Sequence, residues 1–139
     1  MPSEGEMKMP AVNWLAVIAA ALSMFVLGAV WYSPVLFVKA WAKAAGLEID
    51  YEKRGNFAAI LGVSFVLTLV MATNLAFFTA PLDLGGTIAA AVAAGLGWAA
   101  LSLWVISLFE RRPFVYVLIN GGYLTVGFAL MGLILGVWK

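Results

Sequence analysis

The sequence predicts an all-α membrane protein, with four transmembrane helices in an antiparallel bundle and a short amphipathic interfacial helix after the first span. Three observations predict this fold. Of the 139 residues, 65% are hydrophobic and 11% are charged, whereas soluble domains carry about 25% charged residues. The charges border four uncharged stretches of 30, 28, 26 and 26 residues, each longer than the roughly 20 apolar residues that cross a bilayer. Finally, Pro34 and Gly46 bracket a short segment that carries Lys39 and Lys43.

The first predicted span covers residues 11–32. Trp14 lies near one end and Trp31 and Tyr32 lie at the other, where amphipathic rings favour the headgroup level. We expect residues 1–9 to form a disordered lead-in. This segment is not net basic, and the apolar run after it is too long for a signal peptide. We therefore expect the first span to remain in the mature protein.

Pro34 cannot continue the first helix with a normal backbone hydrogen bond, and Ser33 suits the N-cap of a new helix. We expect this helix over residues 34–45, with Gly46 ending it. Its apolar face and its basic face are formed by Val35, Val38, Ala42 and Ala45, and by Lys39 and Lys43. About a dozen residues cannot span a bilayer, so the helix is expected to lie in the membrane interface.

Three further spans are predicted, at residues 56–78, 87–109 and 114–138. A charged, polar segment at 48–55 precedes them, and tight turns at 79–86 and 110–113 join them. Because these turns are short, the last three helices are expected to be antiparallel neighbours. Residues 10–139 would thus form a single transmembrane domain.

The distribution of Lys and Arg predicts the orientation. The loops after the first and third spans hold six basic residues, and the opposite side holds only Lys8 and Lys139. Since short basic loops stay in the cytoplasm, we expect a multi-pass protein of the inner (cytoplasmic) membrane with both termini outside.

Small residues mark where membrane helices can approach closely. Two stripes on the third span and one pair on the fourth repeat every four residues: Ala91, Gly95 and Ala99; Ala89, Ala93 and Gly97; and Gly132 and Gly136. They indicate either packing within one bundle or a homo-oligomer interface. Trp98, near the middle of the third span, would fill a groove against another helix or contact a lipid or apolar ligand.

Asp, Glu, Lys, Arg and His are missing from all four predicted spans, although such residues mark proton relays and coupled transport. The polar positions that remain inside the membrane are Ser64, Thr68, Asn120 and Tyr123. They would form hydrogen bonds between helices. Alternatively, they would line the pore of a small uncoupled channel or transporter for a small solute.

The cytoplasmic rim holds the densest group of aromatic and basic residues: Trp31, Tyr32, Ser33, Pro34, Phe37, Lys39, Trp41, Arg111 and Arg112. Basic groups among aromatic rings at the headgroup plane can hold anionic lipid phosphates. The alternative is an ordinary aromatic belt combined with the positive-inside bias. Glu110 is expected to pair with a basic residue of the first loop and so to join the two cytoplasmic loops.

Neither Cys nor His occurs in the sequence. Disulfides, thiolate or imidazole metal sites and His-based triads are therefore excluded. We expect no catalytic residues, no metal, no cofactor and no nucleic-acid partner.

The chain resembles the family of small membrane proteins catalogued as domain of unknown function 1761. Three blocks carry the resemblance: Leu27-Gly28-Ala29-Val30-Trp31-Tyr32-Ser33-Pro34, Phe109-Glu110-Arg111-Arg112-Pro113 and Ile119-Asn120-Gly121-Gly122-Tyr123. Family members often carry His after the last tyrosine, where this chain has Leu124. The resemblance implies four spans and supplies no activity.

The leading hypothesis is a non-enzymatic membrane protein that acts as an oligomeric or accessory module. Its partners would be membrane lipids or a partner membrane protein, in a homo-oligomer or a larger membrane complex.

Overall fold

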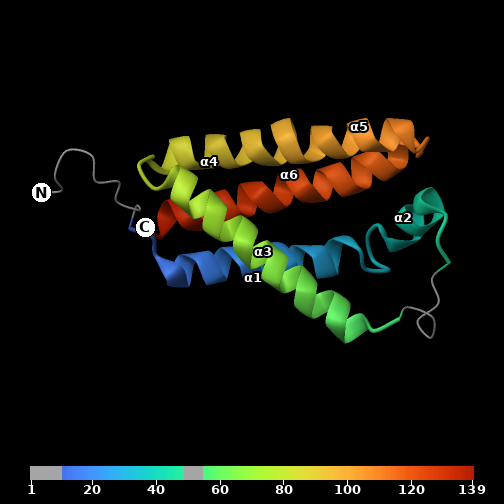
Figure 1. Ribbon diagram of the computed structural model, residues 1–139, viewed down its shortest axis with the longest axis horizontal. Coiled ribbons are helices and arrows are strands. Elements are labelled where there is room, and N and C mark those ends of the chain that lie inside the picture. Colours follow the sequence, from blue (N-terminus) through green and yellow to red (C-terminus); the bar gives the residue numbers. More distant parts are fainter. Residues whose placement is uncertain (1–10, 49–54) are drawn as a thin grey trace, which may run out of the picture.

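The computed structural model describes residues 11–48 and 55–139. Its elements in chain order are α1 (Trp14–Trp31), α2 (Val38–Ala45), α3 (Phe57–Thr79), α4 (Leu84–Val92), the π-helix η1 (Ala93–Ala100), α5 (Leu101–Phe109) and α6 (Phe114–Val137). Because α4, η1 and α5 form one continuous helix, four helices are long and apolar enough to cross a membrane (Figure 1). The predicted all-α membrane fold is confirmed. The predicted lead-in at 1–9 and part of the charged connection, residues 49–54, lie outside the described residues.

Short polar side chains determine where three spans begin. Asn13, Asn56 and Asp83 each occupy an N-cap and accept a hydrogen bond from the backbone N–H three residues later, at 3.2, 3.1 and 2.7 Å. The Asp83 cap starts α4 at Leu84, three residues before the predicted span. The predicted turn at 79–86 is correspondingly shorter, and Gly85 and Gly86 belong to the first turn of a helix.

The interfacial helix is shorter than predicted. Residues 33–37 form turns, and α2 begins only at Val38, with no side-chain cap. The predicted capping role of Ser33 is wrong, because its backbone carbonyl accepts from the N–H groups of Leu36 and Val38 (3.1 and 3.3 Å). Val35 is consequently exposed outside the helix. The predicted end is confirmed, since Gly46 adopts a left-handed conformation with φ 70°.

α6 lies at the centre of the bundle and packs against α1, α4 and η1 (Figure 1). Glycines allow the close approach to the third span. A Cβ added to Gly132 would collide with the Cβ of Ala91, and one added to Gly95 would lie 2.6 Å from the Cβ of Phe128. The stripe containing Ala91 and Gly95 therefore packs within the protomer.

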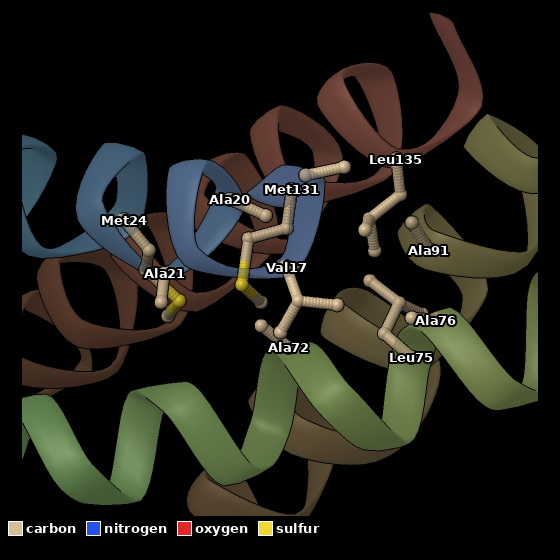
Figure 2. Close-up of a cluster of buried hydrophobic side chains, with 11 residues drawn as sticks. Val17, Ala20, Ala21, Met24, Ala72, Leu75, Ala76, Ala91, Met131 and Leu135 are labelled. Carbon is tan, nitrogen blue, oxygen red and sulfur yellow. The ribbon is translucent and has the colours of Figure 1, made fainter. Parts of the chain in front are cut away.

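The core is built from small and flexible side chains, most of them contributed by α1, α3 and α6 (Figure 2). Five alanines of the cluster are fully buried together with Val17, Met24 and Met131, whereas large residues such as Leu15 and Leu67 face outward. This pattern suits a lipid environment, where apolar side chains gain little by leaving the tails and close backbone contact favours association.

α3 crosses α1 obliquely, and α1 is its main neighbour rather than the next helix in sequence (Figure 1). Its C-terminal end is fixed by Lys139, whose Nζ donates to the carbonyl of Thr79 at 2.6 Å. This ammonium group complements the negative end of the helix dipole. A small pocket of about 130 Å³ lies beside Lys139, between α1, α3 and α6.

The third span contains a feature that the sequence does not predict. Ala93–Ala100 form the π-helix η1, and π-helical turns are rare in proteins. On the outer face, Ala89, Ala93 and Gly97 are exposed, and a Cβ added to Gly97 would meet no atom within 4 Å. Trp98 is 75% exposed, so within the protomer it fills no groove.

Candidate functional site

Trp31 joins the end of α1 to the middle of the first half of α6. Its indole Nε1 donates to the carbonyl of Ile119 at 2.9 Å. A Cβ added to Gly122 would lie 3.0 Å from Cζ2 of this ring. The absent side chain at Gly122 therefore makes room for the indole, and Trp31 packs against α6 instead of serving only as an interface anchor.

Tyr32 forms a second connection, one residue further along. Its hydroxyl donates to Oδ1 of Asn120, and Nδ2 of Asn120 donates to the carbonyl of Tyr116 at 3.0 Å. Burial, with additional effects of Tyr123 and Tyr116, raises the pKa of Tyr32 above its usual range. The phenol is thus protonated at neutral pH and acts as a hydrogen-bond donor to the amide.

Tyr123 completes this contact one turn below Asn120. Its hydroxyl donates to the carbonyl of Met24 at 3.3 Å. A Cβ added to Gly28 would lie 3.2 Å from the hydroxyl oxygen of Tyr123. Gly28 and Gly122 thus open space for one aromatic ring from each helix. We call Trp31, Tyr32, Asn120 and Tyr123 the α1–α6 joint.

Aromatic contacts attach α2 and the turn before it to this joint. Trp41 on α2 meets the Tyr32 ring edge-on, with centroids 5.6 Å apart. Phe37 meets Trp31 at 4.9 Å, and Tyr32 meets Tyr123 at 5.5 Å. Such pairs contribute about 0.5–1.5 kcal/mol beyond area burial. The orientation of α2 therefore depends on the joint.

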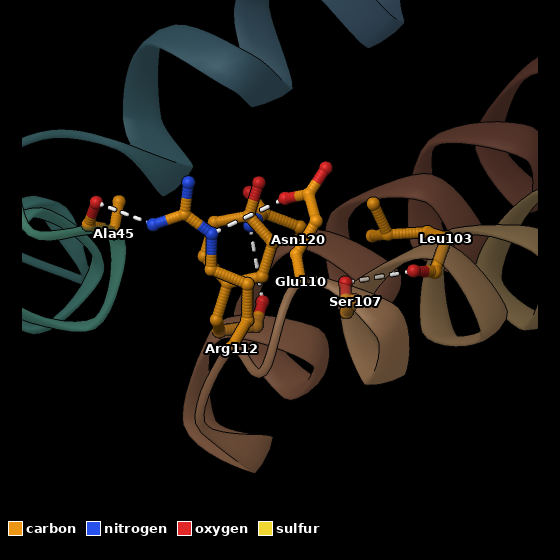
Figure 3. Close-up of polar contacts among 7 residues, drawn as sticks. Ala45, Leu103, Ser107, Glu110, Arg112 and Asn120 are labelled. Carbon is orange, nitrogen blue, oxygen red and sulfur yellow. Dashed lines mark hydrogen bonds and ion pairs between the residues drawn. The ribbon is translucent and has the colours of Figure 1, made fainter.

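Arg112 holds the C-terminal end of α2. One terminal nitrogen of its guanidinium donates to the carbonyl of Ala45 at 2.8 Å, where α2 ends, and Nε pairs with Glu110 at 3.3 Å (Figure 3). The guanidinium also lies 5.5 Å from the centre of the Tyr116 ring. Arg112 thus satisfies a carbonyl at the end of a helix with a positive charge, as helix termini favour.

The two loops at this end are joined by a different residue than predicted. Glu110 pairs with Arg112 of its own turn, and it is Arg112 that reaches the first loop. The predicted pairing of Glu110 with a first-loop base is not seen within residues 11–48 and 55–139. Both side chains are partly exposed, at 37% and 52%, so the ion pair itself contributes little stability.

Lys39, Lys43 and Arg111 are exposed at the same end of the bundle. Ala42, between the lysines, is buried, so α2 presents its basic side away from the bundle. We call Lys39, Lys43, Arg111 and Arg112 the basic rim. Ser33 is partly buried and Pro34 exposed in the turn before α2, and Lys53 and Arg54 lie outside the described residues.

The polar positions inside the membrane form two separate sets. Ser64 is exposed on α3, and the buried Thr68 donates back to the Ser64 carbonyl at 2.8 Å. Asn120 and Tyr123 instead make their contacts with α1 and the residue that follows it. No hydrogen bond connects the two sets across the described part of the chain.

The joint brings together the segments that the sequence singles out, although almost 90 residues separate them. Across residues 15–136 the sequence matches the family described as a protein of unknown function, DUF1761. The chain belongs to this family. No curated protein and no solved structure matches it. Both halves of the joint and all four residues of the basic rim lie in the DUF1761 region.

The joint is a structural arrangement of satisfied polar groups. The phenol of Tyr32 and the amide of Asn120 bond to each other, and the Trp31 indole bonds to a backbone carbonyl. In the part of the chain that the structure describes, no group of three or more His, Cys, Asp or Glu side chains could hold a metal ion. The effect of the joint is to fix α2, and with it Lys39 and Lys43, at one end of the bundle.

Several groups that take part in these contacts could not be predicted from the sequence. The carbonyls of Ile119 and Ala45 are backbone groups, and Gly28 and Gly122 act through the space they leave. The sequence does offer a signal for these two glycines, because Gly28 lies three residues before Trp31 and Gly122 immediately precedes Tyr123. Nothing in the sequence distinguishes Arg112, which faces α2, from its neighbour Arg111.

Proposed function

We propose that this DUF1761 protein is a non-enzymatic membrane module whose basic rim retains anionic phospholipid, alone or within a larger membrane complex. One observation carries the proposal. The joint and Arg112 hold α2 against the bundle, so that Lys39, Lys43 and Arg111 stand exposed at the same end. Fixed cations at the headgroup level attract anionic lipids by about 1 kcal/mol each.

The proposal includes an orientation in the membrane. Since basic residues concentrate on the α2 side, this side would face the cytoplasm and both termini would lie outside. The cytoplasmic leaflet is also the one that carries negative surface potential. Orientation and lipid preference are therefore consistent with each other.

The composition of the spans supports a passive role. All four membrane-crossing helices lack Asp, Glu, Lys, Arg and His, the residues that usually carry proton relays and ion coupling. The channel alternative depended on a shared polar path. Thr68 and Asn120 each donate to a carbonyl of their own helix, and no hydrogen bond among the described residues joins them, so a shared polar path is not supported.

The rim is tested with the double variant Lys39→Gln/Lys43→Gln. Both side chains are exposed, so the fold should persist, whereas retention of phosphatidylglycerol should fall by about tenfold or more, given about 1 kcal/mol per cation. Native mass spectrometry of the full chain, released from mixed phosphatidylglycerol and phosphatidylcholine, measures this directly.

The control is Lys8→Gln, which removes a basic residue from the side that the sequence places outside. It should leave retention unchanged. Equal retention by the wild type and the Lys39/Lys43 variant would contradict the proposal. The difference in lipid retention between the wild type and the Lys39/Lys43 variant should also shrink as salt rises, because exposed charges are screened.

A further inference from the structure

Arg111 occupies a backbone position that normally belongs to glycine. The N–H of Arg112 donates to the Ser107 carbonyl at 2.9 Å, and the N–H of Arg111 donates to the Leu108 carbonyl at 3.2 Å. This pair of bonds is a Schellman motif, in which the residue after the helix cap adopts the left-handed conformation. Arg111 has φ 57° there, the only positive φ of a non-glycine residue in the described chain.

The end of α2 provides an internal comparison. The same pair of bonds runs from Leu47 to Ala42 at 2.8 Å and from Gly46 to Lys43 at 3.2 Å, and the left-handed residue is glycine. A side chain in this conformation crowds the backbone, and glycine avoids the cost. Strained positions of this kind concentrate at functional sites. This favours a functional role for the Arg111 side chain.

The surroundings of Arg111 differ from those of its neighbour. Arg112 is occupied by Glu110 and by the Ala45 carbonyl. Arg111 is exposed, and its guanidinium has no hydrogen bond or ion pair to any residue of 11–48 or 55–139. It lies in a turn of four residues between two spans, so in a bilayer this turn would stand at the membrane surface.

Exposed aromatic rings lie on the two helices that this turn joins. Phe109 ends the third span and is 85% exposed. Trp104 and Phe114 pair across the turn with centroids 5.4 Å apart, and both remain exposed. An exposed cation in the turn, with exposed aromatic rings on the helices that flank it, is complementary to a phospholipid, whose phosphate stands above its glycerol and acyl chains.

We propose that Arg111 is the phosphate contact of the anionic lipid, with Phe109 and the Trp104–Phe114 pair beside the glycerol and upper acyl chain. A guanidinium suits this ligand because it donates two parallel hydrogen bonds to phosphate oxygens. The inference rests on the proposed function and assigns the lipid phosphate to one residue of the basic rim.

Three substitutions separate the charge of Arg111 from its backbone strain. Arg111→Gly removes both, Arg111→Gln removes only the charge, and Arg111→Lys keeps both. In native mass spectra of the full chain with phosphatidylglycerol, the Gly and Gln variants should retain about fivefold less lipid than the wild type, and the Lys variant should retain more than either. In lipid-free neutral detergent, only Arg111→Gly should raise the Tm, by roughly 3 °C.

Two results would overturn the assignment of Arg111. One is wild-type retention in the Gly and Gln variants, and the other is an equal loss in all three variants. If either result were found while Lys39→Gln/Lys43→Gln still lost lipid, the proposed function would stand without a specific role for Arg111. If Arg111→Gly left the Tm unchanged, this would contradict the inference that the left-handed backbone of Arg111 is strained.

An added competitor identifies the source of the phosphate. Inorganic phosphate, at the same concentration as phosphatidylglycerol, should not displace the lipid, because it cannot use the aromatic rings. Displacement would assign Arg111 to a free anion and overturn the lipid contact.

Discussion

Gly132→Val should destabilise the bundle strongly, by about 3 kcal/mol, at the upper end of the usual cost of overpacking. A Cβ at this position collides with the Cβ of Ala91 and lies 3.4 Å from the Thr87 carbonyl. Both atoms belong to the fully buried face of α4, so no flexible side chain can move aside. The two helices would have to separate, and the contact at Gly95 would open with them.

The measurement is the Tm of the full chain in detergent, compared with Gly97→Val. Both glycines lie inside spans, but a Cβ added to Gly97 meets nothing within 4 Å. The control should therefore stay close to the wild type. Similar losses in both variants would mean that the cost arises from valine itself and not from the contact between α4 and α6.

Asn120→Leu should have the second-largest effect. Leucine cannot accept the hydrogen bond of the Tyr32 hydroxyl, which is partly buried between helices. An unsatisfied group of this kind costs about 1–3 kcal/mol in water-soluble proteins and about 1 kcal/mol between membrane helices. Because the Tyr32 ring also packs against Trp41 on α2, α2 should become less firmly held to the bundle. Hydrogen exchange over Val38–Ala45 should become faster.

A double-mutant cycle with Tyr32→Phe isolates this bond. Once the hydroxyl is gone, Asn120→Leu should cost less, with a coupling of about 1 kcal/mol. Additive losses would mean that the two side chains act independently. Loss of solute flux in Asn120→Leu at unchanged stability would instead favour the channel hypothesis.

The positions of the spans could be predicted because the bilayer excludes charge. Asp83 and the Glu110–Pro113 turn border helices that cannot extend far beyond them, and the observed spans begin and end within three residues of those expected. The neighbour of α3 could not be predicted in this way. Short turns constrain which ends are near each other, whereas the oblique crossing onto α1 depends on side-chain packing along the whole helix.

The joint could be predicted only in part. Trp31 and Tyr32 fit an interface belt by residue type alone, and the same amphipathic character lets them donate hydrogen bonds to α6. Arg111 and Arg112 are adjacent and chemically identical. Backbone conformation and the position of Ala45 separate them, and neither is encoded in a local pattern. The π-helix at Ala93–Ala100 likewise has no marker in its alanines and glycines.

We propose that the basic rim selects anionic lipid. Native mass spectrometry of the wild-type chain, released gently from membranes with equal phosphatidylglycerol and phosphatidylcholine, tests it most directly and also reports the number of copies. We predict that phosphatidylglycerol is enriched severalfold among the retained lipids. Retained lipids that match the bulk composition would contradict the claim.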